Sequence, residues 1–121
     1  MLYHKRGYWN KQIENEAICF IKRWHGKPSQ HLSYIIMSKT RRNHIYSIGE
    51  IYKAIGHAKL NNCYIFETAY KKEKLTKVVF RTSFNDYDDI SIVLSNGIIV
   101  TAWLNRKTDN HETLNLNNYC C

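Results

Sequence analysis

Hydrophobic residues near the start of the chain recur at helical spacing. Over residues 9–25 they stand at i, i+4, i+7, i+8 and i+11, which is one face of an α-helix. These positions are occupied by Ile13, Ala17, Phe20, Ile21 and Trp24. Gly26 and Pro28 follow and end the pattern. The spacing predicts a helix over residues 9–25, with Trp24 packed in the core.

A second helix is predicted from about Ile48 to Ala58, where apolar residues again recur at i, i+3, i+4 and i+7. Ser47 and Glu50 have the spacing of a capping box, in which each side chain bonds to a backbone amide at the start of the helix. Between the two helices, residues 31–37 are apolar enough for either a short strand or a buried helical turn.

The hydrophobic period changes to two after residue 60, which is typical of strands. Four short runs are closely spaced, so an antiparallel meander is the natural arrangement. The candidate strands are Tyr64–Ala69, Leu75–Thr82, Asp89–Ser95 and Ile98–Leu104. The pattern as a whole predicts an α+β fold, with N-terminal helices packed on one face of a four-stranded antiparallel sheet.

Two registers are open for the last hairpin, and they place Thr101 and Trp103 on different faces. A two-residue Asn-Gly turn pairs Leu94 with Ile99 and directs Thr101 and Trp103 into the core. A three-residue Ser-Asn-Gly turn pairs Leu94 with Ile98 instead. We favour the second register because it separates apolar from mixed residues more cleanly. Thr101 and Trp103 then lie on a concave open face.

Length and composition indicate one domain covering residues 1–121, with 44% hydrophobic and 23% charged residues. No apolar run approaches the roughly 18 residues of a membrane span. Residues 1–7 are basic but lack the apolar region of a secretory signal. We therefore expect a cytoplasmic protein that does not enter membranes.

Positive charge is concentrated in the first half of the chain. The net charge is +8, and residues 1–60 carry eleven Lys or Arg against three acids, whereas residues 61–121 carry seven of each sign. A one-sided basic protein attracts polyanions. The expected partner is nucleic acid, with RNA favoured, or a protein that handles nucleic acid.

Residue types that hold metals show no ligand spacing here. The four cysteines stand at 19, 63, 120 and 121 without a C-x-x-C pair, which favours two buried thiols and two in the tail. The six histidines are equally scattered. Nucleotide-binding and metalloprotease motifs such as G-x-x-x-x-G-K-[ST] and H-E-x-x-H do not occur. We expect no metal and no cofactor.

Metal-free RNA cleavage is the chemistry that side chains alone can perform, since it needs a base, an acid and a cation near the phosphate. His111 is the candidate acid or base, because its reference pKa of about 6.5 lies near neutrality. Arg81, near the end of a strand, is the candidate cation for the phosphate. The alternative is an inert histidine in a polar tail and an arginine that is merely solvated.

Substrate placement is assigned to residues around the last strand. Trp103 offers a surface for stacking a base, and Thr101 and Asn105 can orient oxygens. Their alternative is structural, because Thr and Trp favour strands and Asn favours turns. The expected phosphate contacts are Lys39, Arg41 and Arg42.

The order of elements resembles the barnase/EndoU/colicin/RelE-like superfamily of metal-independent ribonucleases, many of them toxins. Residues 45–55 look like the helix that precedes the sheet in small RelE-like domains. Residues 77–81 and 98–103 look like two of its strands. The resemblance covers about residues 38–114, makes the helix at 9–25 an addition and leaves 115–121 as a tail. It implies a small RNA-binding ribonuclease of toxin type.

A non-catalytic binder fits the same size and charge. The chain is rich in Asn, Ile, Lys and Tyr, which AT-rich coding produces, as in low-GC bacteria and their phages. The rival hypothesis is a phage-encoded inhibitor that binds a host nucleic-acid-handling protein.

Overall fold

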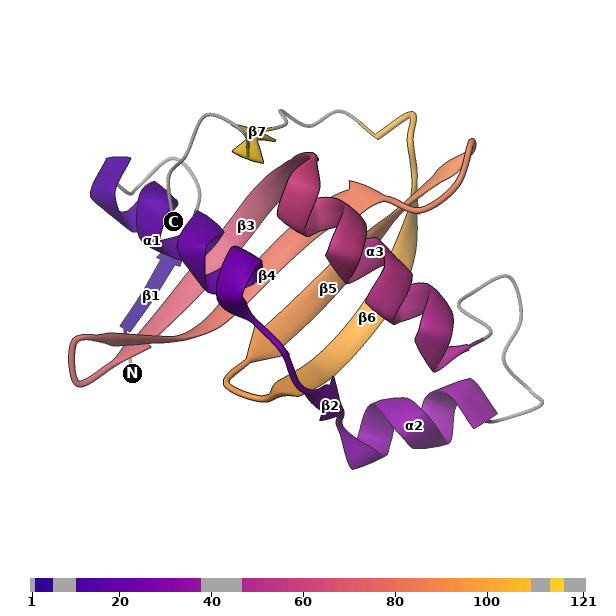
Figure 1. Ribbon diagram of the computed structural model, residues 1–121, viewed down its shortest axis with the longest axis horizontal. Helices are drawn as coiled ribbons and strands as arrows, with labels where there is room; N and C mark the ends of the chain where they lie inside the picture. Colours follow the sequence, from indigo (N-terminus) through magenta and orange to yellow (C-terminus); the bar gives the residue numbers. More distant parts are fainter. Residues whose placement is uncertain (1, 6–10, 38–46, 110–113, 117–121) are drawn as a thin grey trace.

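The structure, a computed structural model, describes residues 2–5, 11–37, 47–109 and 114–116 (Figure 1). Over this part of the chain, helices and strands account for most residues. The helices are α1 (Lys11–Arg23), α2 (Gln30–Met37) and α3 (Ile48–Leu60). The strands are β1 (Leu2–Lys5), β2 (Lys27–Pro28), β3 (Asn62–Lys71), β4 (Lys74–Ser83), β5 (Asp88–Ser95), β6 (Ile98–Arg106) and β7 (Leu114–Asn115).

The antiparallel meander predicted from the sequence is formed by β3, β4, β5 and β6. The expected four-stranded sheet is nevertheless too small. The strand order is β1-β3-β4-β5-β6-β2, with β7 also paired to β3, and β2 runs parallel to β6. The three additional strands have two to four residues each, which is too few for a period of two to be recognised. The fold is α+β with a mixed sheet.

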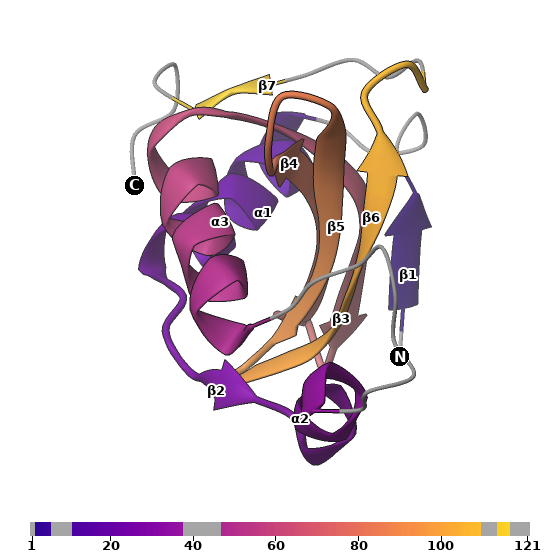
Figure 2. The ribbon, with the colours of Figure 1, turned by 90° about the vertical axis from the view of Figure 1, so that its right-hand side faces the viewer.

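Helices α1 and α3 lie side by side on one face of the sheet, and both contact β4. Figure 2 shows the sheet curving around these helices, so that they occupy its concave side. The expectation of a concave open face is therefore wrong. A strongly twisted sheet bends around the layer that it buries, which leaves the opposite side convex. Helix α2 contacts β6 and follows β2.

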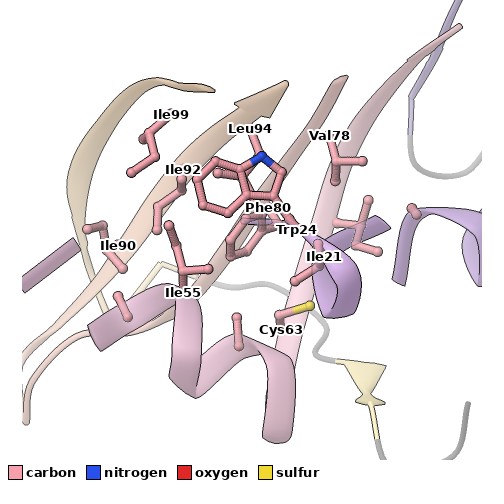
Figure 3. Packing of buried hydrophobic residues seen from close by; sticks show 14 of the residues in the cluster. Ile21, Trp24, Ile55, Cys63, Val78, Phe80, Ile90, Ile92, Leu94 and Ile99 are labelled. Atoms are coloured by element: carbon pink, nitrogen blue, oxygen red, sulfur yellow. The ribbon is translucent and has the colours of Figure 1, made fainter. Parts of the chain in front are cut away.

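One hydrophobic core lies between the helices and the sheet. In Figure 3 the indole of Trp24 lies beside Phe80, with Leu94 and Ile21 close by. Trp24 is buried, as predicted, and its Nε1 donates a 2.6 Å hydrogen bond to the carbonyl of Ser95. Burial of side chains of this size stabilises a fold by roughly 1.5–3 kcal/mol each. The same cluster draws buried residues from all three helices.

Helix α1 is therefore an integral part of this core and not an addition to it. Ala17, Ile18 and Ile21 are fully buried, and the helix contacts α3, β3 and β4. The buried stripe is centred on Ile18, whereas Ile13 and Phe20 at its margins are half-buried.

The second helix begins where the sequence predicts. Ser47 is its N-cap, and the Ser47 hydroxyl accepts a 3.2 Å hydrogen bond from the Glu50 amide and donates to the Glu50 carboxylate at 3.1 Å. This satisfies an amide that the first helical turn would otherwise leave unpaired. The ambiguous residues 31–37 belong to a helix, α2.

The last hairpin combines features of the two expected registers. Beside its two-residue turn, Leu94 pairs with Ile99, which rules out the favoured three-residue turn. The next pair is Val93 with Thr101, so Val100 is an extra residue in β6, a β-bulge. The bulge shifts the alternation by one residue. Thr101 and the alternate residues after it consequently face away from the helices, as the favoured register required.

Candidate nucleic-acid interface

The face of the sheet opposite α1 and α3 carries four of the residues that the sequence singled out, Arg81, Thr101, Trp103 and Asn105. We call it the outer face. Pairing across β3, β4, β5 and β6 places four of its residues in one row: Tyr64, Arg81, Ser91 and Trp103. Alternation along the strands adds Glu67, Val79, Val93, Thr101 and Asn105, and the register shift in β3 adds Phe66.

Trp103 is the most accessible large side chain of the outer face, with 41% of its surface exposed. Thr101, two residues earlier in β6, is half-buried on the same face. Burying a tryptophan in the core is more favourable than leaving it exposed, by an amount that grows with its apolar area. An exposed ring fixed on a strand is therefore a natural stacking surface.

A second aromatic group lies on β3, across the outer face from Trp103. Ile65 pairs with Phe80 and Glu67 pairs with Val79, so Phe66 is an extra residue in β3. The rings of Tyr64 and Phe66 are in edge-to-face contact, with centroids 4.9 Å apart. Both residues are half-buried. The outer face thus has aromatic side chains on both β3 and β6.

Asn105 lies on the outer face two residues after Trp103. Ser91, on the neighbouring strand β5, donates a 2.6 Å hydrogen bond from its hydroxyl to Oδ1 of Asn105. Ser91 is fully buried, whereas Asn105 is half-buried. Within the described part of the chain, the amide nitrogen of Asn105 has no hydrogen-bond acceptor. The bond from Ser91 fixes the orientation of the Asn105 amide, with Oδ1 towards β5.

Arg81 is placed differently from the expectation. The residue is only 4% exposed, and its Nε donates a 2.9 Å hydrogen bond to Oδ2 of Asp89. Its Nη2 donates to the carbonyls of Arg106, at 2.8 Å, and Asp109, at 3.5 Å. These bonds attach the turn after β6 to the sheet. Arg81 therefore acts as a structural cation and does not present its charge to a phosphate in solution.

Lys107 completes the cluster around Asp89. Its Nζ donates to Oδ1 of Asp89 at 2.9 Å and to the hydroxyl of Ser83 at 2.7 Å. Burial alone raises the pKa of Asp89, but hydrogen bonds from Lys107 and Arg81, together with their positive charges, hold this pKa below its ordinary value. The carboxylate is ionised at neutral pH and accepts hydrogen bonds from both cations.

The other predicted site residues lie outside the described residues. These are the candidate acid or base His111 and the expected phosphate contacts Lys39, Arg41 and Arg42. Among the predicted residues in the described ranges, Thr101, Trp103 and Asn105 are brought together on β6. Arg81 shares a row with Trp103, but its charge is used internally.

Sequence reasoning missed Tyr64, Phe66 and the role of Ser91. The signal for Ser91 was a polar residue between Ile90 and Ile92 in an otherwise apolar strand. The signal for Phe66 was weaker, because a β-bulge has no period of its own. Its ring reaches the outer face only through the extra residue in β3.

A separate groove of about 570 Å³ lies between α1, the start of β4 and the turn between β5 and β6. Its apolar lining includes Phe20 and Leu75, and its polar lining includes the exposed cations Arg23 and Lys74. Its carboxylate, Glu16, accepts hydrogen bonds from Tyr70 at 2.5 Å and Gln12 at 3.2 Å. The lining cations outnumber the acids.

Comparisons with known proteins identify no relative of this chain. No protein-family model, no curated protein and no solved structure matches this chain. Among the residues that the structure describes, no group of three His, Cys, Asp or Glu side chains is placed to hold a metal ion. None of the helices in this part of the chain is long and apolar enough to cross a membrane.

Proposed function

We propose that this protein binds single-stranded RNA across the outer face of its sheet. The observation that carries the proposal is the exposed ring of Trp103, held on a strand beside Thr101 and Asn105 and away from the helix layer. Antiparallel sheets bind single strands by stacking bases on aromatic side chains, and such stacking contributes roughly 1–3 kcal/mol per base. Tyr64 and Phe66, on β3, offer a second stacking point, separated from Trp103 by β4 and β5.

The charge of the chain supports a polyanionic partner. The net charge of +8 favours association through release of counterions from phosphates. Arg106, at the end of β6, has an exposed side chain. Its Nε lies 3.9 Å from Oδ1 of Asp88. Lys39, Arg41 and Arg42 remain the proposed phosphate contacts from the basic half of the chain.

Metal-independent cleavage, as the RelE-like resemblance implies, is the less supported part of this function. Arg81, one of its two expected catalytic residues, has its guanidinium bonded to Asp89 and to two carbonyls. The proposal of catalysis therefore rests on His111. Binding through the sheet needs neither residue.

The test is fluorescence anisotropy with a labelled single-stranded RNA at low and moderate salt. We expect wild type to bind and Trp103→Ala to bind about tenfold more weakly, because one stacking contact is lost. Tyr34→Ala is the matched control, since Tyr34 is 74% exposed on α2 and outside the outer face. Equal affinities for wild type and Trp103→Ala would exclude the sheet as the binding surface.

Cleavage is tested separately by incubating the RNA with protein in EDTA. Fragments made by wild type and absent with His111→Ala would support a ribonuclease. Intact RNA that remains bound would support a binding protein without this activity.

The groove beside α1 favours a second candidate, the inhibitor. Its apolar lining with Arg23 and Lys74 suits an acidic segment of a nucleic-acid-handling protein that carries an apolar side chain. Reversing both charges, in Arg23→Glu with Lys74→Glu, should abolish inhibition of such an enzyme. The same double variant should retain the contribution of Trp103 to RNA affinity.

A further inference from the structure

The edge of the sheet at β6 is open over most of its length. β6 has nine residues and is the last long strand on its side of the sheet (Figure 1). β2 pairs only with Ile98 and Ile99, and within the described part of the chain only β5 pairs with β6 beyond them. Residues 100–106 therefore form the open edge, and their side chains are half-buried or exposed.

The direction of the backbone at Ile99 fixes the direction along the rest of the strand pair. In an antiparallel ladder, the amide and carbonyl of one residue point to the same neighbouring strand, and successive residues alternate. The carbonyl of Ile99 points away from β5, because it accepts a 2.9 Å hydrogen bond from the amide of Ser29. Leu94, which pairs with Ile99, therefore directs its own backbone groups to β4.

Two residues of the open edge consequently direct their backbone groups to solvent. The pairing of β5 with β4 has no irregularity, so Ile92 and Ile90 share the direction of Leu94. Their partners on β6 are Ala102 and Leu104, which point away from β5. We call these two the outward residues. Among the described residues, no strand lies opposite them on that side.

The features that commonly keep a sheet edge from pairing are missing from this stretch of sequence. Natural edge strands are often short, or carry lysine or proline. Residues 98–105 contain no charged residue and no proline, and Arg106 follows at the end of the strand. At the opposite margin, β1 has four residues and ends at Lys5. The contrast indicates that the β6 edge pairs with another strand.

A second copy of this chain fits the open edge because the edge is complementary to itself. A two-fold axis at Trp103 places Ala102 of one copy opposite Leu104 of the other, and the reverse. Each of these pairs can exchange two hydrogen bonds, as an antiparallel ladder requires. In this register the outward residues pair only with each other. Neighbouring registers place one of them opposite Val100 or Arg106, at the ends of the edge.

The side chains agree with this register. The two Trp103 residues lie directly opposite each other on the outer face, as a cross-strand aromatic pair. On the helix side, Leu104 meets the small side chain of Ala102. The two Arg106 residues lie about 20 Å apart along the strands. This distance exceeds the Debye length of about 8 Å at physiological salt, so their repulsion is screened.

We propose that two copies of this chain pair through the open edges of β6 and form a symmetric dimer with one continuous sheet. The outer faces of the two copies then join, with both Trp103 residues at the centre. The inference goes beyond RNA binding and does not rest on it, since dimerisation is measured without RNA.

Sedimentation of the full chain over a range of concentrations tests the dimer. We expect wild type to reach twice the 14.4 kDa mass of one chain. Ala102→Pro removes an outward amide, which an edge strand tolerates. Both copies lose a hydrogen bond, so dimerisation should weaken about tenfold. A wild type that stays monomeric at its highest soluble concentration, or a folded Ala102→Pro that dimerises equally well, would overturn the inference.

Disulfide trapping tests the register and keeps the inference testable should Ala102→Pro fail to fold. Opposite Cα atoms at the axis lie about 4.5 Å apart, within the range that disulfides span. Trp103→Cys should therefore yield a crosslinked dimer under mild oxidation, seen on a non-reducing gel. Thr101→Cys is the matched control on the same face, because its two copies lie about 14 Å apart. Wild type gives the background from the native cysteines. Absence of crosslinking in Trp103→Cys, or equal crosslinking in both variants, would overturn the inference.

Discussion

The buried carboxylate of Asp89 shows how a single residue organises the end of the sheet. It accepts hydrogen bonds from Arg81 and Lys107, and Arg81 in turn binds the carbonyls of the turn after β6. Removing one member of such a cluster leaves an uncompensated buried charge, which commonly costs about 3–5 kcal/mol. The strand that carries Trp103 ends at this cluster.

Replacing Asp89 by Asn should destabilise the protein at pH 7 by about 3 kcal/mol, because Arg81 loses its counter-charge. The pKa of Asp89 is held below its ordinary value, so its stabilising contribution is present above the unfolded pKa of about 3.9. It is lost as the pH falls from there through the folded pKa. Urea denaturation at a series of pH values should therefore show a flatter acid dependence in Asp89→Asn.

Asp86→Asn is the matched control for this substitution, because Asp86 is exposed in the turn between β4 and β5. It should leave the free energy of unfolding at pH 7 almost unchanged. An equally small effect of Asp89→Asn would mean that the cluster does not hold the end of the sheet.

The contribution of Tyr70 to stability has the opposite pH dependence to that of Asp89, because it is lost at high pH. Burial, followed by its hydrogen bond to Glu16 and the negative charge there, raises the pKa of Tyr70 well above 10. Its contribution to stability is therefore complete below pH 10 and declines as the pH rises above this value towards the folded pKa. Tyr70→Phe should weaken this alkaline loss, measured by denaturation between about pH 8 and pH 11.

Tyr34→Phe provides the comparison, since Tyr34 is exposed on α2. Its alkaline profile should match that of wild type. Identical profiles for wild type and Tyr70→Phe would show that the contact between β3 and α1 does not depend on the proton of Tyr70.

At the level of elements, two glycines illustrate how closely the segment between α1 and β2 approaches the turn between β5 and β6. A Cβ added at Gly26 would lie 2.4 Å from the carbonyl carbon and oxygen of Gly97. The amide of Lys27 also donates to the carbonyl of Gly97 at 3.1 Å. Only a residue without a side chain permits this approach of backbone to backbone.

Gly26→Ala should therefore lower the melting temperature sharply, by an amount equivalent to several kcal/mol. Gly56→Ala should instead raise the melting temperature, because no atom lies within 4 Å of its added Cβ and the residue is exposed within α3. Alanine is favoured over glycine in a helix by about 1 kcal/mol. Thermal denaturation of the two variants tests both signs, and a stable Gly26→Ala would contradict the packing described here.

The turn between β3 and β4 contains local strain that a substitution can relieve. Lys72 and Glu73 have positive φ angles of 52° and 64°, which non-glycine residues seldom adopt. Glu73→Gly should stabilise the hairpin by about 1 kcal/mol, measured by urea denaturation. Gly97→Ala, at a φ of 76°, is the converse control and should destabilise the protein. Loss of stability in Glu73→Gly would contradict this conformation of the turn.

The elements that the sequence predicted well are those with a long period. Helices α1 and α3 and the meander from β3 to β6 each show a hydrophobic pattern over eight or more residues. Strands β1, β2 and β7 are too short for that signal. The bulge at Val100 is a tertiary feature, and it alone decides that Thr101 and Trp103 face away from the core.

For the whole molecule, the sequence identified a cationic protein and the part of β6 that carries the candidate interface. Charge and strand alternation are local properties, so Thr101, Trp103 and Asn105 could be recognised as a group. The partners of Arg81 could not, because Asp89, Arg106 and Asp109 approach it only through the pairing of strands. A strand-end arginine has the same sequence signature whether it binds a phosphate or a buried carboxylate.

The central claim is that the outer face binds RNA through Trp103. The most direct measurement is the affinity of wild type, Trp103→Ala and Tyr34→Ala for one labelled single-stranded RNA, with the fold of each protein verified by circular dichroism. We predict affinities for wild type and Tyr34→Ala that agree within about twofold, and about tenfold weaker binding by Trp103→Ala. Undiminished binding by a folded Trp103→Ala variant would contradict the claim.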